Sequence, residues 1–434
     1  MSLSERDRRR PVGHGVRRLV DKALLGMLDK ALWRSGIGRL QLTLPSGEIA
    51  VLGQPDGSGA TAIVLNNYRV LWKLMRGGLL GFAESYMDGD FATDDLKAVF
   101  DCYLANEQAM SAAVPALVST RRSDRRFHLS RANTRAGSRR NIAAHYDLGN
   151  AFYRLWLDKS MSYSSGIYPG ADASGLGPER QSKDASGRGP ERQSKDASLE
   201  VAQQEKHDHI LAALDLQRGQ SLLEIGCGWG ALAEAAGRRG ADVTAITISR
   251  EQHAEASARI EAAGLRDSVE IRFQDYRDVA GAFDRIVSIE MIEAVGEEHW
   301  PLYFRAIADR LRPGGSAVIQ AITIREDIFE LYRQKPDFIQ RYIFPGGMLP
   351  TVDRMRQGTV AEGLGFEELE RFGASYALTL ADWRRRFDAA WPRIEAMGFD
   401  QRFRRMWSYY MIYCEVGFER GLIDVGLYRI RKPG

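Results

Sequence analysis

The residues best suited to chemistry lie in a glycine-rich loop after a short apolar segment. Residues 222–225 are apolar apart from one glutamate, and Gly226, Gly228 and Gly230 follow directly. A helix-forming segment comes next and ends at Gly240. Glycine is needed where a chain turns tightly and lets a ligand lie against bare backbone. The order of strand, glycine loop and helix therefore predicts a site for a nucleotide-type cofactor.

The glycine spacing and the residues after the second expected strand distinguish between two cofactors. The glycines read GxGxG after Glu224, not GxGxxG. A nicotinamide enzyme usually binds its ribose through an acidic residue at the end of the second strand. The expected strand, 243–248, ends instead at Thr247 and Ile248, with Gln252 about one helical turn later. A NAD-dependent oxidoreductase is therefore the less favoured hypothesis.

The elements that would position this loop continue downstream. Three further strands are expected within 269–278, 283–296 and 308–322, and a late strand at 425–430 is expected as an antiparallel edge. Strands that alternate with helices predict an α/β fold with a mostly parallel sheet. The pattern resembles the Rossmann-like class I methyltransferases that bind S-adenosylmethionine, which implies a seven-stranded sheet whose last strand is antiparallel.

Composition limits the class of protein. The chain has 434 residues, of which 44% are hydrophobic and 27% charged, with a net charge of +3. These values are typical of a soluble protein with two or three domains. Its three cysteines form no CxxC pair, which favours a reducing cytoplasm over a disulfide framework. His207 and His209 are expected on a solvated helix face, so no metal site is predicted.

Residues 1–120 are expected to form a small α/β domain. Residues 17–33 have apolar residues at helical spacing beside basic ones, which suits either packing on the domain or binding to anionic lipid. Residues 38–53 alternate around Pro45, Ser46 and Gly47, which predicts a hairpin.

Two segments lie outside the expected domains. Residues 121–140 form an arginine-rich connector whose charge suits phospholipid headgroups; nucleic acid is not expected, because Phe127 is the only aromatic residue there. Residues 172–195 hold a 12-residue unit twice, DASGLGPERQSK and DASGRGPERQSK. This tandem duplication has almost nothing to bury, so we expect a disordered surface loop within a methyltransferase domain at 141–434.

Longer stretches resemble one family closely, the cyclopropane-fatty-acyl-phospholipid and mycolic acid cyclopropane synthases. The resemblance runs from about Gly81 almost to the C-terminus. Its motifs in this chain include GFAESYMDGD, GSRRNIAAHYDLGN, MSYSSGIY, EIGCGWG, MIEAVG, RYIFPGGMLP and WSYYMIYCEVGFERG.

The resemblance implies roles for individual residues. Cofactor contacts are implied at Tyr163, Ser164, Glu224, Gly226, Gly228, Gly230, Thr247, Ile248, Gln252, Tyr276 and Arg277. Glu293 and Tyr376 match residues that hold a bicarbonate ion, the proposed base, and Tyr146 matches an aromatic residue of the acyl pocket. Cys414 matches a cysteine described as catalytic, although a buried cysteine in an aromatic helix more often serves packing.

Two residues depart from the family pattern at the implied bicarbonate site. Ser165 stands where the family has cysteine, and Gln320 where it has histidine. Both can still donate hydrogen bonds, so an anion could bind. A base placed differently could also remove a different proton and give another product.

The resemblance implies a cytoplasmic C-methyltransferase, peripheral to the inner face of the membrane. It would use S-adenosylmethionine to convert the cis double bond of a phospholipid acyl chain into a cyclopropane. A methylene- or methyl-branched product is the alternative, and a non-catalytic lipid-binding protein is the rival of another class. The expected partners are the acyl chain and an anionic membrane surface, with a homodimer left open.

Overall fold

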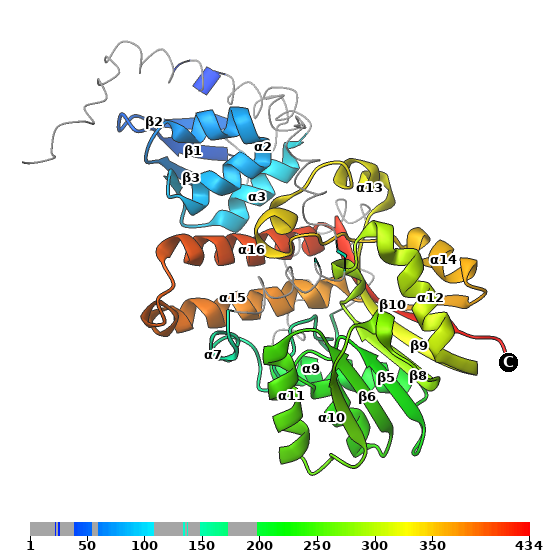
Figure 1. Ribbon diagram of the computed structural model, residues 1–434. Helices are drawn as coiled ribbons and strands as arrows, with labels where there is room; N and C mark the ends of the chain where they lie inside the picture. Colours follow the sequence, from blue (N-terminus) through cyan, green and yellow to red (C-terminus); the bar gives the residue numbers. More distant parts are fainter. Residues whose placement is uncertain are drawn as a thin grey trace, which may run out of the picture. The chain divides into compact units, whose positions relative to one another are not determined.

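The structure is a computed structural model that describes residues 22, 25–26, 39–53, 60–107, 133–134, 137, 148–171 and 198–434, in two compact units (Figure 1). One unit comprises residues 1–120 with 401–409, and the other comprises 121–400 with 410–434. The expected boundary at residue 120 did not anticipate the contribution of 401–409. The predictions for Tyr146 and the repeat at 172–195, and most of those for 17–33 and 121–140, lie outside the described residues.

The described residues of the first unit include a four-stranded sheet, the helices α2 and α3, and the first residues of α16 (Gln401–Glu419). Its strand order is β2-β1-β3-β4. The elements are β1 (Arg39–Thr43), β2 (Ile49–Gly53), β3 (Ala60–Leu65), α2 (Arg69–Met87), β4 (Phe91–Ala92) and α3 (Leu96–Ala105). β1 and β2 pair antiparallel around a turn in which Gly47 adopts a φ of 87°, which confirms the predicted hairpin. Lys73 joins the end of α2 to β4 through ion pairs with Asp88 and Asp90 of 2.7 and 2.6 Å.

The second unit is built on a seven-stranded sheet in the order β10-β11-β9-β8-β5-β6-β7. The strands are β5 (Ser221–Ile225), β6 (Asp242–Thr247), β7 (Val269–Phe273), β8 (Phe283–Ile289), β9 (Leu311–Ile324), β10 (Gly365–Arg371) and β11 (Ile423–Arg431). The five strands β5 to β9 pair parallel, as the sequence predicts. The fold is that of a class I methyltransferase.

The position expected for the last strand is wrong. β11 is antiparallel, but it pairs with β9 on one side and with β10 on the other, so β10 forms the edge. β10 has the sequence GFEELER, which is polar and largely exposed, as an edge strand can be. Its composition gave no strand signal in the sequence.

Helices connect and cover the strands. They are α7 (Asn150–Tyr153), α9 (Leu199–Ala213), α10 (Ala231–Arg238), α11 (Arg250–Ala262), α12 (Trp300–Arg310), α13 (Glu326–Tyr332), α14 (Val352–Ala361), α15 (Gly373–Ala396) and α16 (Gln401–Glu419). Ser198 and Ser249 cap α9 and α11 by accepting backbone N–H groups at 3.3 Å. None of the described helices is long and apolar enough to cross a bilayer.

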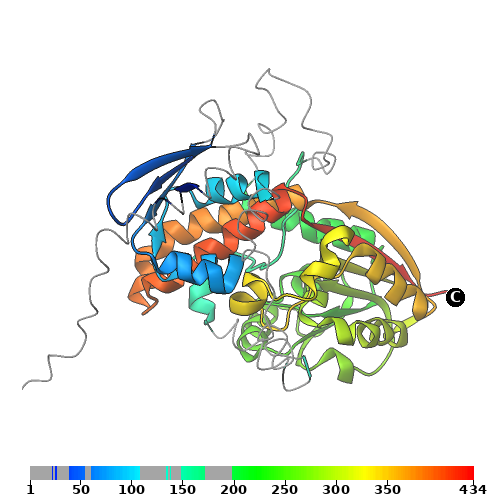
Figure 2. The same cartoon turned by 90° about the horizontal axis from the view of Figure 1, so that it is seen from above.

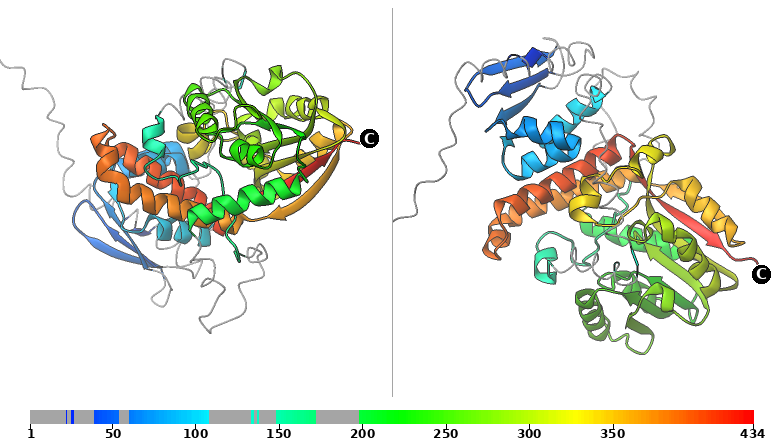
Figure 3. Two further views of the ribbon diagram at one scale, coloured as in Figure 1. Left: turned by 90° about the horizontal axis from the view of Figure 1, so that it is seen from below. Right: turned by 45° about the horizontal axis from the view of Figure 1, so that its top comes forward.

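α15 and the part of α16 from Tyr410 onward lie side by side (Figures 2 and 3). Arg384 on α15 forms an ion pair of 3.1 Å with Glu415 on α16, whose side chain is buried. A charged pair of this kind fixes the register of the two helices. These helices carry Tyr376 and Tyr410 to the site described next.

Candidate active site

A cavity lies at the carboxyl ends of the parallel strands. Residues that follow β5, β6, β7 and β8 line it, together with a segment at 161–164 and residues of α9. Ligands of open α/β sheets bind at this edge, because the loops that follow neighbouring strands converge there. All the predicted cofactor residues line the cavity except Gly230.

The glycine loop adopts the conformation that its residue type permits. Gly226 and Gly228 have φ values of 85° and 53°, and the N–H of Gly226 donates to the carbonyl of Ile246 at 3.0 Å. A Cβ at Gly228 would meet no atom within 4 Å, so this residue leaves open space in the cavity. Gly230 caps α10, and a Cβ there would lie 3.0 Å from the side chain of Ala256. Its role is therefore the packing of α10 on α11, not contact with a ligand.

The predicted residues after β6 and β7 are held by their neighbours. The Thr247 hydroxyl donates to Oε1 of Gln252 at 2.8 Å, and both side chains are buried. Arg277 forms a buried ion pair of 2.6 Å with Asp275, which the sequence analysis missed. Burial raises the pKa of the Tyr276 hydroxyl to about 12. These side chains form a rigid polar end of the cavity.

Two buried charged groups line the cavity near its glycine loop. Glu224 is 3% exposed, and its Oε2 has no hydrogen-bond partner among the described residues. Burial raises the pKa of Glu224 to about 8. Lys206 on α9 donates to the hydroxyl of Ser164 at 2.8 Å, and burial lowers the pKa of its amine to about 8. Lys206 was not predicted, because a lone lysine in a helix is usually solvated.

The solvated position expected for His207 is wrong. Its side chain is 5% exposed, lines the cavity and lies 3.5 Å from the Ser162 hydroxyl, measured from Nε2. Burial lowers its pKa well below the usual value, so the ring is neutral. The residues that the structure describes contain no cluster of histidine, cysteine and carboxylate groups suited to a metal ion.

A second cluster centres on Glu290, which the sequence analysis also missed. Its Oε1 accepts hydrogen bonds from the N–H of Ser165 at 2.9 Å and from Nε2 of Gln320 at 2.7 Å. Its Oε2 accepts a bond of 2.7 Å from the Tyr376 hydroxyl. Glu290 therefore joins three of the predicted catalytic residues, and it also lines the cofactor cavity.

Glu293 lies beside this cluster but bonds elsewhere. Its Oε1 accepts from the N–H of Ile322 at 2.6 Å, and its Oε2 is buried with no hydrogen-bond partner among the described residues. Burial and the charge of Glu290 raise the pKa of Glu293 to about 8. The structure thus joins Tyr376 to Glu290, whereas the resemblance had implied a site held by Glu293 and Tyr376.

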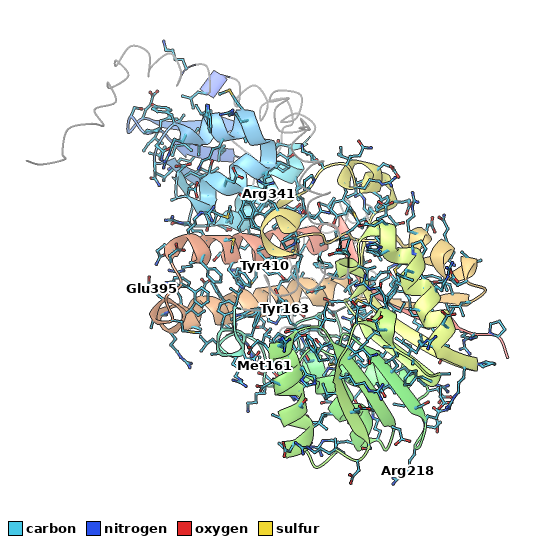
Figure 4. All side chains as sticks on the ribbon, viewed as in Figure 1. Met161, Tyr163, Arg218, Arg341, Glu395 and Tyr410 are labelled. Carbon is cyan, nitrogen blue, oxygen red and sulfur yellow. The ribbon has the colours of Figure 1, made fainter. Side chains whose placement is uncertain are left out.

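Aromatic rings surround Tyr163. Its ring centroid lies 5.1 Å from that of Trp383 and 5.5 Å from those of Tyr153 and Trp156. Its hydroxyl lies 3.0 Å from the hydroxyl of Tyr410 (Figure 4). Of these residues, Tyr163 lines the cavity and gives it an aromatic side, and the rings of Tyr153, Trp156 and Trp383 are fully buried behind it.

Cys414 does not line the cavity. Burial and then the charge of Asp337 raise the pKa of its thiol far above the usual value. A thiol of raised pKa carries little thiolate, which is the nucleophilic form.

Comparisons with known proteins match this geometry. The family model for mycolic acid cyclopropane synthetase matches residues 133–427. The chain is 35% identical over 418 residues to a tuberculostearic acid methyltransferase of Mycobacterium tuberculosis, covering 93% of this chain and 90% of that protein. It is 33% identical over 378 residues to a cyclopropane-fatty-acyl-phospholipid synthase of Escherichia coli, covering 86% and 88%.

A solved structure agrees with the sequence relatives. A mycolic acid cyclopropane synthase complexed with SAH and CTAB superposes with a TM-score of 0.58 at 27% identity. The match covers 68% of this chain and 98% of that one.

Proposed function

The chain belongs to the mycolic acid cyclopropane synthetase family, and on this premise we propose that it methylates the cis double bond of an unsaturated phospholipid acyl chain. The observation that carries the proposal is a cavity that joins a glycine loop to the buried carboxylates of Glu224 and Glu290 and to the ring of Tyr163, behind which further aromatic rings are packed. A cyclopropane fatty acid is the proposed product.

The cavity fits S-adenosylmethionine. When bound, this cofactor supplies an electrophilic methyl group on a positively charged sulfur. The unpartnered Oε2 of Glu224 can accept from the ammonium of its methionyl part, and the open space at Gly228 lets a ligand approach the backbone. Thr247, Gln252 and Tyr276, which line the cavity, would hold its nucleoside part. A related structure complexed with SAH supports this assignment.

The residues around the cavity suit an alkene substrate. An alkene is a weak nucleophile, and its methylation leaves a positive charge on the acyl chain. The Tyr163 ring lines the cavity and can stabilise such a charge, and the buried rings of Trp156 and Trp383 packed against it exclude the water that would trap the cation. The long alkyl cation CTAB bound by the related structure is consistent with a lipid-shaped pocket in this family.

A methylene-branched product is the second candidate. The two most informative relatives carry different product names at nearly the same identity, 35% and 33%. Ser165 and Gln320, the residues that depart from the family pattern, both contact Glu290. A base that differs from that of the family could remove a different proton from the charged acyl chain, which favours a methylene branch over a cyclopropane.

The test is mass spectrometry of the purified enzyme's products. Dioleoylphosphatidylglycerol vesicles are incubated with S-adenosylmethionine labelled in its methyl group. We expect labelled acyl chains heavier by one methylene unit, and ring-opening chemistry then separates a cyclopropane from a methylene branch. Cofactor binding by calorimetry without any labelled acyl chain would exclude the acyl alkene as substrate and favour the non-catalytic lipid-binding protein.

We also propose that the first unit contacts an anionic membrane surface. The first part of α2 exposes Trp72 and Met75 about one helical turn apart, 54% and 63% exposed, and Leu79, 40% exposed, follows the break in the helix at Gly78. Arg69 and Arg76 flank them, and Arg76 lies over the Trp72 ring at 4.3 Å. Apolar side chains that insert at a lipid surface beside arginines are typical of interfacial helices.

Vesicle flotation tests this contact. We expect the double variant Trp72→Ser, Met75→Ser to lose most of its binding to phosphatidylglycerol vesicles. The matched control is Ile49→Ser, Val51→Ser, which removes two exposed apolar residues of β2. Equal loss in both variants, or none in either, would contradict the proposal.

A further inference from the structure

The family resemblance implies a bicarbonate ion as the base, but the residues present do not fit one. The hydrogen-bond donors that would hold the ion at this place, the N–H of Ser165, Nε2 of Gln320 and the Tyr376 hydroxyl, all donate to Glu290. A carboxylate has the same planar pair of anionic oxygens as bicarbonate. We propose that Glu290 supplies the active-site base from the chain itself, in place of an exogenous anion.

The position of Glu290 supports this assignment. Among the residues of its cluster, Glu290 is the one that also lines the cofactor cavity, where Ser165, Gln320 and Tyr376 do not. The proton to be removed lies on the transferred methyl group, so the base must reach the region where that group leaves the cofactor. A group in both the cluster and the cavity meets this requirement.

The backbone at Glu290 gives an independent observation. Its φ is 47°, in the left-handed region that residues other than glycine rarely adopt. Such a conformation is unfavourable for a residue with a side chain and persists where the surroundings fix it, often at active sites. Here three donors from three separate segments of the chain fix the carboxylate.

The charges around Glu290 suit a base. Burial raises the pKa of Glu290, whereas the Tyr376, Ser165 and Gln320 hydrogen bonds and then the charge of Lys206 oppose the rise. Glu293, the other acid in this region, bears a pKa of about 8 and so is largely neutral at pH 7. One carboxylate of the pair can therefore remain ionised while the other stays protonated.

The proposed step balances in atoms and charge. The π pair of the alkene forms the bond to the methyl carbon, and the carbon–sulfur bond breaks with its pair on sulfur, which leaves the positive charge on the acyl chain. Glu290 then takes a proton from the new methyl group, and the released C–H pair closes the third bond of the ring. The proton ends on the Glu290 carboxylate, and no oxidant or reductant is required.

The inference rests on the proposed function, and the experiment separates the two. Wild-type enzyme is assayed on dioleoylphosphatidylglycerol vesicles in buffer freed of carbon dioxide and in buffer with added bicarbonate. We expect the turnover rates in the two buffers to agree within about twofold. No turnover in either buffer would overturn the proposed function, whereas a loss of about tenfold without bicarbonate would overturn only the inference.

Variants test the carboxylate directly. Glu290→Gln keeps the size and shape of the side chain and one acceptor oxygen, but it replaces the other oxygen with a donor NH2 and removes the base. Turnover should therefore fall by about 100-fold or more, while the Kd for S-adenosylmethionine changes by less than about tenfold. Glu261→Gln, an isosteric change at an exposed surface position, is the matched control. Near wild-type turnover in Glu290→Gln would overturn the proposal.

Chemical rescue provides a readout that a structural role would not move. Glu290→Gly relieves the backbone conformation and leaves room for a small anion among the three donors. We expect added formate, acetate or bicarbonate to restore part of the turnover, and the restored rate to rise with the basicity of the anion. Failure of every anion, in a variant that folds and binds S-adenosylmethionine, would overturn the proposal.

Discussion

The Glu290 carboxylate lies close enough to Glu293 to add its charge to the effect of burial, and together they raise the pKa of Glu293 to about 8. The two side chains come from one turn after β8. Three groups donate hydrogen bonds to the Glu290 carboxylate, whereas Glu293 accepts one from the N–H of Ile322. Their unequal surroundings divide the pair: the three hydrogen bonds favour the ionised form of Glu290, whereas burial and the charge of Glu290 favour the protonated form of Glu293.

This division predicts a pH-dependent gain of stability in Glu293→Gln. The folded pKa of Glu293 lies above its unfolded value of 4.5, so its favourable contribution is complete below pH 4.5 and is lost as the pH rises to about 8. Glutamine keeps the acceptor for Ile322 and does not ionise. The free energy of unfolding of the variant should rise relative to that of the wild type by about 1 kcal/mol per pH unit between pH 5 and 8, as measured by urea unfolding. If the unfolding free energies of the two proteins changed in parallel with pH, the raised pKa of Glu293 would be contradicted.

Glu224 should make cofactor binding depend on pH. Burial raises the pKa of its carboxyl to about 8, and a positively charged ligand favours the ionised form. The affinity for S-adenosylmethionine should therefore increase about tenfold from pH 6 to pH 7.5, measured by calorimetry. Glu224→Gln should bind more weakly with a flatter pH dependence, and an unchanged slope in this variant would assign the effect to another group.

Asp275→Asn should destabilise the second unit and weaken cofactor binding. The Asp275 side chain pairs with Arg277 at 2.6 Å and also accepts the N–H of Arg277. Removing one charge of a buried pair leaves the other uncompensated, at a cost of about 3 kcal/mol. Thermal unfolding and calorimetry measure the two effects. Asp267→Asn, at an exposed turn position, should change neither.

The three cysteines should react slowly with a thiol reagent in the folded protein. Burial raises the pKa values of Cys102, Cys227 and Cys414, so little thiolate is present at pH 7.5. Titration with a chromogenic disulfide should show slow reaction of the native chain and fast reaction of all three thiols in guanidinium. Rapid loss of methyl transfer with modification of Cys414 alone would instead support a nucleophilic role.

Deleting residues 172–195 should leave the fold intact. The deletion removes both copies of the repeat and joins Ala171 to Asp196. Ala171 bonds to the Tyr168 carbonyl at 3.1 Å and Ser198 caps α9, so the ordered contacts on each side lie outside the deleted segment. The melting temperature should agree with that of the full chain within about 2 °C. A deletion variant that fails to fold would contradict the duplication hypothesis.

The sequence predicted the parts of the fold that local pattern determines. The apolar strands, the glycine loop and the hairpin around Gly47 follow from periodicity and backbone preference. The order of strands is a long-range property, so β11 was placed at the edge instead of between β9 and β10. β10 was missed because its three glutamates, Glu367, Glu368 and Glu370, interrupt the apolar pattern expected of a strand.

The site was predicted less completely. Glu293 was implied by the family resemblance. A carboxylate in an apolar run is also costly unless it has a role, and this argument applies equally to Glu290, three positions earlier. Lys206 and His207 lie on a helix of mixed polarity, and only tertiary packing turns them toward the cavity. Except for Gly230, the cofactor residues implied by the family motifs line the cavity, but the motifs gave no role to Glu290, which accepts hydrogen bonds from three of the implied catalytic residues.

The helix α16 contributes Gln401–Tyr409 to the first unit and the residues from Tyr410 onward to the second. A ribosome releases the chain from its N-terminus, so residues 1–120 emerge long before the helical segment that completes their unit. The first unit can be finished only after strands β5 to β10 have been synthesised. We therefore expect the N-terminal unit to complete its folding only late in translation, after residues 401–409 have been synthesised.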